Sequence, residues 1–301
     1  MSGGGAMRNM LFAATALSAM TWALAGGAAD LMPVAPMLPA RDFQVVTLPV
    51  APVVDGDLGE WEGVAAQTIP IAPTLEQDGQ NRVGQAEVAL RVGVHGDRVY
   101  FAARWADDAP DEKFRPWRWR EGKYQRQELR DDQFVVRFHS SGSYDACMLS
   151  PTSYQVDVWR WSAGRSNLAG LAEDQSHLIS VDPVEDASEF LGPKGTTYLV
   201  KRNDAGEPFY KNTKAPATKG AEELPGIEII GSGAGSLIDV SAKGVWRDGF
   251  WNLELSRALN TGHDDDVVLG GGQKIAGAIG VFNRSANEHK SVSGTLNFLF
   301  P

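Results

Sequence analysis

An alternation of apolar and polar residues begins near residue 85. Every second position from Ala86 to Val94 is apolar, which predicts a strand over residues 85–94. His95, Gly96 and Asp97 then form a turn sequence, and residues 98–105 repeat the strand pattern. These two segments predict an antiparallel hairpin.

Similar patterns recur along the chain and predict further strands over residues 43–48, 133–139, 154–161, 245–255, 274–282 and 291–300. Asp248 and Gly249 lie between aromatic residues and predict a tight turn inside the segment 245–255. The strand 154–161 has two faces, with Tyr154, Val156 and Val158 on one and Asp157, Trp159 and Trp161 on the other. We expect an all-β fold, an antiparallel β-sandwich with long loop insertions.

One stretch departs from this pattern. Residues 162–235 contain few strand signals and many loop residues. A loop of that length is uncommon inside a domain and is often functional. We therefore expect an extended insertion that packs on the sandwich or against a partner.

The first 25 residues have a different character. Arg8 precedes an apolar run from Met10 to Ala25 that ends in an Ala-Leu-Ala sequence. A positive residue, a short apolar segment and a small-residue end predict a signal peptide over residues 1–25, with an N-terminal membrane anchor as the alternative. Residues 26–42 are expected to form a linker and residues 43–301 the domain. We expect an exported, periplasmic protein with no transmembrane segment in its mature chain.

Composition excludes several functions. The chain has 28 Lys and Arg against 38 Asp and Glu, a formal net charge of −10, which argues against nucleic-acid binding. It has one cysteine, Cys147, so neither an internal disulfide nor a covalently attached c-type haem is possible. No nucleophile motif, phosphate-binding loop or metal-like spacing of histidines is present. We therefore expect no catalytic site in this chain.

Two features remain as candidates for ligand binding. Asp264, Asp265 and Asp266 form an acidic run that could hold a calcium ion, although the pattern favours a solvated turn. Met148 is the single methionine after Met37. Its thioether is either a metal ligand or a core side chain.

Several segments together resemble the ethylbenzene-dehydrogenase-type haem-binding domain. They are Asp55–Trp61, Arg98–Trp105, Asp131–Phe138, Met148, Asp157–Trp161 and Gly244–Trp251 with Arg257 and Leu259. Such domains are the γ subunits of periplasmic molybdenum enzymes of the dimethyl-sulfoxide-reductase family. The Asp-Gly…Trp opening is also similar to family 9 carbohydrate-binding modules, whereas the later motifs are more specific. The match runs in order through about residues 43–301.

The resemblance implies a β-sandwich that holds one non-covalent b-type haem between a methionine and a lysine. The methionine falls on Met148, and the segment 287–293 assigns the lysine to Lys290, with His289 as a rival. Neighbouring strand residues point to opposite faces, and Lys290 shares its face with Val292, which favours Lys290 as the buried ligand. Two protein ligands would leave the iron no open position, so the haem would transfer electrons.

The resemblance also implies partners. They are a molybdopterin catalytic subunit and an iron–sulfur subunit in a heterotrimer, with a soluble cytochrome c as electron partner. A second reading is a sugar-binding module in which Trp117, Trp119, Trp159 and Trp161, if exposed, stack on sugar rings. A structural or adhesion domain is a third.

Overall fold

The protein is described by a computed structural model that covers residues 35–75, 79–192, 194–285 and 290–301. The predicted signal peptide, residues 26–34 of the predicted linker, and His289 lie outside these residues. The elements are strands and three short 3-10 helices, η1 (Leu58–Trp61), η2 (Ser166–Ala169) and η3 (Ser236–Ile238). No helix in the described ranges is long and apolar enough to cross a membrane.

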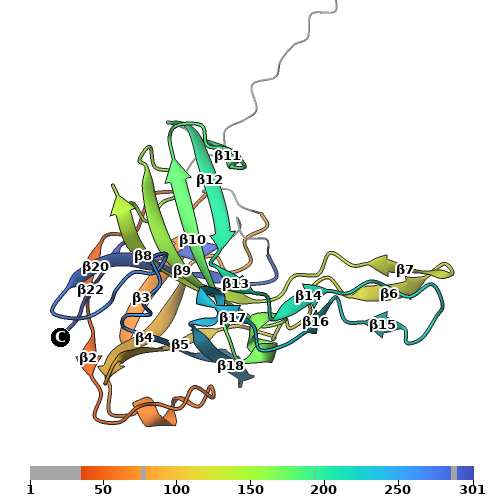
Figure 1. Cartoon of the computed structure of the whole chain (residues 1–301), viewed down its shortest axis with the longest axis horizontal. Helices are drawn as coiled ribbons and strands as arrows, with labels where there is room; N and C mark the ends of the chain where they lie inside the picture. The colour runs from red at the N-terminus through yellow and green to blue at the C-terminus, as the bar shows by residue number, and fades with distance from the viewer. Residues whose placement is uncertain (1–34, 76–78, 193, 286–289) are drawn as a thin grey trace, which may run out of the picture. The chain divides into compact units, whose positions relative to one another are not determined.

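Two sheets make up the body of the structure (Figure 1). The first, called the β9 sheet, contains β11 (Ser188–Gly192), β12 (Gly195–Asn203), β10 (Glu173–Ser180), β9 (Tyr154–Ser162), β8 (Gln133–Gly142), β20 (Lys274–Phe282), β22 (Leu296–Leu299) and β1 (Arg41–Gln44). The second, called the β5 sheet, contains β3 (Gln67–Pro73), β4 (Ala86–His95), β5 (Arg98–Ala106), β19 (Phe250–Ala258) and β18 (Ser241–Arg247), with β2 (Val46–Thr47) beside β4. Strand β21 (Ser291–Val292) pairs with both β20 and β3 and so joins the two sheets.

The main core lies between these sheets because each presents aromatic side chains to the other. Phe101 on β5 lies 5.3 Å from Trp159 on β9 and 6.0 Å from Phe138 on β8, measured between ring centroids. Tilted and edge-to-face pairs at such separations are favourable beyond their buried area. The sandwich and its largely antiparallel pairing are as predicted, including the Asp248-Gly249 turn that joins β18 to β19.

The β9 sheet is apolar on its outer face as well. Trp159 and Trp161 of β9 lie in the main core, whereas Tyr154, Val156 and Val158 form a second cluster on the other side. An antiparallel sheet in a sandwich usually turns a polar face to water. Here the outer apolar cluster is covered by Tyr144, Met148 and Phe190, which pack against it.

The expectation for residues 162–235 is wrong in its main part. This stretch supplies β10 and β12, which extend the β9 sheet, as well as β11. Short pairs follow, β13 (Gly206–Glu207) with β17 (Ala234–Gly235) and β14 (Tyr210–Asn212) with β16 (Ile227–Ile229). A separate small sheet combines β15 (Glu223–Leu224) with β6 (Trp117–Arg120) and β7 (Lys123–Arg126) (Figure 1).

Candidate functional site

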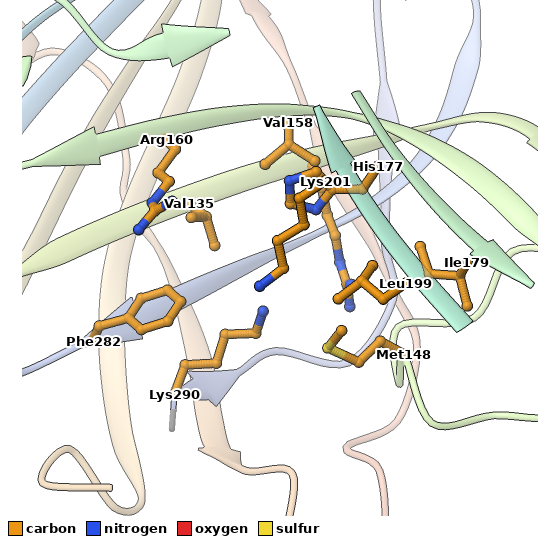
Figure 2. Close-up of a pocket in the computed structure, with 11 residues that line it drawn as sticks. Val135, Met148, Val158, Arg160, His177, Ile179, Leu199, Lys201, Phe282 and Lys290 are labelled. Carbon is orange, nitrogen blue, oxygen red and sulfur yellow. The ribbon is translucent and has the colours of Figure 1, made fainter. Parts of the chain in front are cut away.

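A pocket lies on the outer face of the β9 sheet (Figure 2). Four strands each contribute two residues that are two positions apart and therefore share a face. These pairs are Val135 and Arg137 on β8, Val158 and Arg160 on β9, His177 and Ile179 on β10, and Leu199 and Lys201 on β12. Phe282, Met148 and Lys290 complete the lining. The pocket thus unites Met148 and Lys290, the two residues singled out in the sequence.

Met148 lies in the connection between β8 and β9, in a turn that Asp145 organises. The Asp145 carboxylate accepts hydrogen bonds from the Cys147 backbone N–H at 2.8 Å and from the Ser150 hydroxyl at 2.6 Å. The Arg137 guanidinium donates a hydrogen bond to the Ala146 carbonyl oxygen. These contacts fix the turn, and the half-buried Met148 side chain packs against the outer apolar cluster of the β9 sheet.

Lys290 immediately precedes β21 and is half-buried. Its Nζ lies 5.4 Å from the centroid of the Phe282 ring, a cation–π contact. Its stem passes close to Gly280, where a Cβ would lie 3.4 Å from Lys290 Cδ and 3.1 Å from Val135 Cγ2. The alternation argument for Lys290 does not hold, since Ser291 and Ser293 are as fully buried as Val292. The position of Lys290 in the pocket is observed directly and does not depend on that argument.

The pocket is rich in positive charge. Arg137, Arg160, Lys201 and Lys290 line it, and none of the lining residues that the structure describes is acidic. Figure 2 shows the side chains of Lys201 and Lys290 reaching in from opposite walls with their amines pointing toward one another, and Met148 beside them. Such a concentration of cations in an apolar setting suits an anionic ligand.

His177 is the pocket's titratable imidazole, and it lies directly across the strand pair from Lys201. Burial, followed by the charges of Lys201 and Lys290, holds the pKa of His177 well below its usual range. Its Nε2 lies 3.2 Å from Gln175 Oε1. We expect a neutral imidazole at neutral pH.

Sequence reasoning missed His177, Leu199 and Lys201 as pocket residues because it treated their segment as loop. A signal was present, since residues 196–200 read Thr-Thr-Tyr-Leu-Val between Gly195 and Asn203. β-branched and aromatic residues bounded by turn formers predict a strand. That strand, once predicted, would have extended the sheet on the side where the pocket lies.

The motifs that carried the resemblance lie mostly in the scaffold. Arg257 is fully buried and contacts Asp157 at 2.8 Å. Its guanidinium lies 4.8 Å from the ring centroid of Trp159. Trp161 lies 5.0 Å from Trp251, measured between ring centroids. These residues hold the sheets together beneath the pocket.

The positions of the four tryptophans bear on the alternative hypothesis that the chain is a sugar-binding module. Trp159 and Trp161 are fully buried and so cannot stack on a sugar. Trp117 and Trp119 on β6 are half-buried. Trp117 already carries Arg126 over its ring and donates a hydrogen bond to Thr213.

Comparison with known proteins identifies the family. A family model for ethylbenzene dehydrogenase matches residues 59–293, a span that includes Met148 and Lys290. The chain belongs to the ethylbenzene dehydrogenase family. The family is named after an oxidoreductase. Membership therefore indicates that this chain is an oxidoreductase-related subunit of an enzyme complex.

Solved structures resemble the chain more distantly. A family 9 carbohydrate-binding module from Caldicellulosiruptor kristjanssonii in complex with glucose aligns with a TM-score of 0.37 and 10% identity, over 87% of this chain and 97% of the module. A protein from Bacteroides uniformis to which carbohydrate binding has been ascribed gives the same TM-score and identity, over 86% and 98%. No curated protein sequence matches the chain.

Proposed function

We propose that this chain is a b-type cytochrome subunit of a molybdenum oxidoreductase, with haem bound in the pocket between Met148 and Lys290. It has no catalytic site of its own and passes electrons between an iron–sulfur subunit and an external carrier such as a soluble cytochrome c. The observation that carries the proposal is the meeting of Met148 and Lys290, far apart in sequence, in one pocket of a chain that belongs to this family.

The chemistry of the lining fits haem. Met148 offers a thioether and Lys290 an amine, and both are ligands for haem iron. Val135, Val158 and Leu199 supply an apolar wall for the macrocycle. The remaining cations, among them Arg160 and Lys201, suit the two propionate groups, because buried carboxylates need paired charges.

The pocket must open to admit this group. The space between the side chains is about 30 Å³, which holds no more than about two water molecules. Lys201 and Lys290 occupy the centre (Figure 2), and both have long, flexible stems. Rotation of the Lys201 side chain toward the rim would open space between the Met148 turn and the sheet, while Lys290 stays in the pocket as the amine ligand.

Haem supplies one-electron transfer when it is bound. Met148 would lend a sulfur ligand that favours the reduced state. Lys290 would bind only after its amine loses a proton. The apolar residues of β8, β9 and β12 would exclude water, and Met148 and Lys290 would hold the group so that it serves electron transfer.

Family membership supports a proposal for the partners and the compartment. We propose a heterotrimer with a molybdopterin catalytic subunit and an iron–sulfur subunit, in the periplasm after export. The net charge of −10 favours association with a basic carrier such as a cytochrome c, through electrostatic steering.

Two substitutions test the ligands. In the haem-loaded protein, Met148→Ala and Lys290→Ala should each convert a low-spin absorption and paramagnetic resonance spectrum to high spin. Near-infrared magnetic circular dichroism of the wild type should have the signature of amine and thioether ligation.

Lys211→Ala is the matched control, because this exposed lysine of β14 pairs with Glu228 far from the pocket lining. It should leave the low-spin spectrum unchanged. A low-spin spectrum that persists in Lys290→Ala would exclude Lys290 as ligand, and an imidazole signature would transfer the role to His289 or His177.

A further inference from the structure

A second group of side chains surrounds Arg257, on the inner face of the β9 sheet. Its Nη1 lies 2.8 Å from Asp157, 3.3 Å from Asp174 and 2.9 Å from Asp266. Asp157 and Asp174 are fully buried on neighbouring strands, and Asp266 belongs to the turn after β19. One guanidinium therefore faces three carboxylates.

Two further carboxylates extend this group. Asp204 follows β12, and Asp265 lies in the same turn as Asp266. Asp204, Asp265 and Asp266 each offer an oxygen, and the three oxygens lie within 4.8 Å of one another. Residues from β12 and from the turn after β19 thus converge at one point.

The oxygens of Asp204 are the observation that indicates a ligand. The residue is only 6% exposed, and neither carboxylate oxygen receives a hydrogen bond from any described residue. One carboxylate oxygen of Asp157 and one of Asp174 likewise receive no hydrogen bond from the described residues. A buried carboxylate without a partner costs several kcal/mol, so such oxygens require a cation or a proton.

Nearby cations do not balance this charge. Arg257 is shared among three carboxylates. His263 lies at the rim, 42% exposed, with Nδ1 2.6 Å from Asp239 and 3.9 Å from Asp266. No hydrogen bond or ion pair of the described residues reaches the Asp204 carboxylate.

We propose that Asp204, Asp265 and Asp266 bind a divalent cation, and that Ca²⁺ is the ion this site fits. All three ligands are carboxylate oxygens, which hard cations prefer over the nitrogen and sulfur donors that select zinc or copper. Ca²⁺ also tolerates irregular geometry and completes its shell with water, whereas Mg²⁺ demands a near-octahedral set. Asp265 and Asp266 of the acidic run are thus part of a binding site, whereas Asp264 is exposed.

The ion would join two elements. Asp204 follows β12, whose backbone is held to β10 through the hydrogen bond from the Asp204 N–H to the Asp174 carbonyl oxygen at 3.1 Å. The turn after β19 is held from the other side by the hydrogen bond from Thr261 to Asp266, at 2.5 Å. A cation between them would fix the end of β12, three residues from Lys201 in the pocket. Its role is structural and does not depend on the haem proposal.

The test uses the full chain after treatment with a chelator, with CaCl₂ as the probe. Calorimetric titration should show one Ca²⁺ per chain, and millimolar Ca²⁺ should raise the thermal midpoint, because a ligand that binds the folded state stabilises it. Asp204→Asn should weaken Ca²⁺ binding by about tenfold or more, which is at least about 1.4 kcal/mol. It should also raise the midpoint of the ion-free protein, since it removes an unpaired buried charge.

Asp264→Asn is the matched control, because Asp264 is an exposed carboxylate of the same turn and belongs to none of the converging groups. It should bind Ca²⁺ as the wild type does. If Asp204→Asn fails to fold, Asp265→Asn, at a half-buried residue, provides the same comparison. No binding by the wild type, or equal binding by the Asp204 and Asp264 variants, would overturn the proposal.

Discussion

Within the pocket, the identity of single residues sets both charge and chemistry. Met148 supplies sulfur, Lys290 and Lys201 supply amines, and Val135 and Val158 supply apolar contact. The position of each follows from the two-residue period of its strand or from a local turn. The residues most diagnostic in sequence, such as Arg257 and Trp161, instead build the scaffold.

His177 gives a prediction on pH. Its pKa is lowered in the folded state, so the unfolded chain binds a proton below about pH 6.5 that the folded chain does not. The unfolding free energy should therefore fall as pH drops below about 6.5, by up to about 1.4 kcal/mol per pH unit from this group.

His177→Gln should remove that contribution. The check is urea unfolding of the haem-free wild type and variant at a series of pH values on both sides of neutrality. The wild type should lose more stability than the variant on acidification. Parallel curves for the two proteins would show that His177 is not held neutral by the fold.

At the scale of elements, strands with clear alternation or a clear turn were predictable. The predicted faces of residues 154–161 are confirmed, and β20 has the bounds 274–282 that the sequence predicts. The strands β10 and β12 were missed because charged and polar residues occupy much of both. On β10, Glu173, Asp174 and Gln175 are buried despite their polarity, whereas β12 ends in the exposed Lys201, Arg202 and Asn203. Tertiary contacts override local pattern here.

Part of the candidate site was also predictable, but by another route. Met148 and Lys290 were reached through the family resemblance. His177, Leu199 and Lys201 lie on the missed strands, and no local pattern shows that they meet Met148 in space. Buried charge also has no signature in the local sequence: Asp174, for example, is fully buried.

The approach of β18 to β9 gives a prediction on packing. A Cβ at Gly244 on β18 would lie 2.2 Å from Cζ2 of Trp161, whose side chain is fully buried. Gly244→Ala should therefore lower the unfolding free energy by about 1–3 kcal/mol through overpacking.

Gly63→Ala is the control for this change. Nothing lies within 4 Å of a Cβ at Gly63, so its effect on stability should stay within about 0.5 kcal/mol. Chemical denaturation compares the two variants with the wild type. Equal stability of the Gly244 and Gly63 variants would contradict the close contact between β18 and Trp161.

At the scale of the whole molecule, the two faces of the β9 sheet have different roles. Its inner face packs against the β5 sheet and supplies stability, whereas its outer face carries the pocket. The chain is acidic overall, yet the pocket lining is basic. This contrast would favour an anionic ligand at the pocket over other parts of the molecule.

The central claim is that this pocket binds haem. The most direct measurement is a titration of the folded, haem-free wild-type chain with haemin, followed by absorbance. We expect uptake of one haem per chain, a low-spin Soret spectrum and complete extraction of the haem by acid–acetone, because the single cysteine cannot form a covalent c-type attachment. A folded chain that leaves haemin unbound, or that binds it without a defined stoichiometry, would contradict the account.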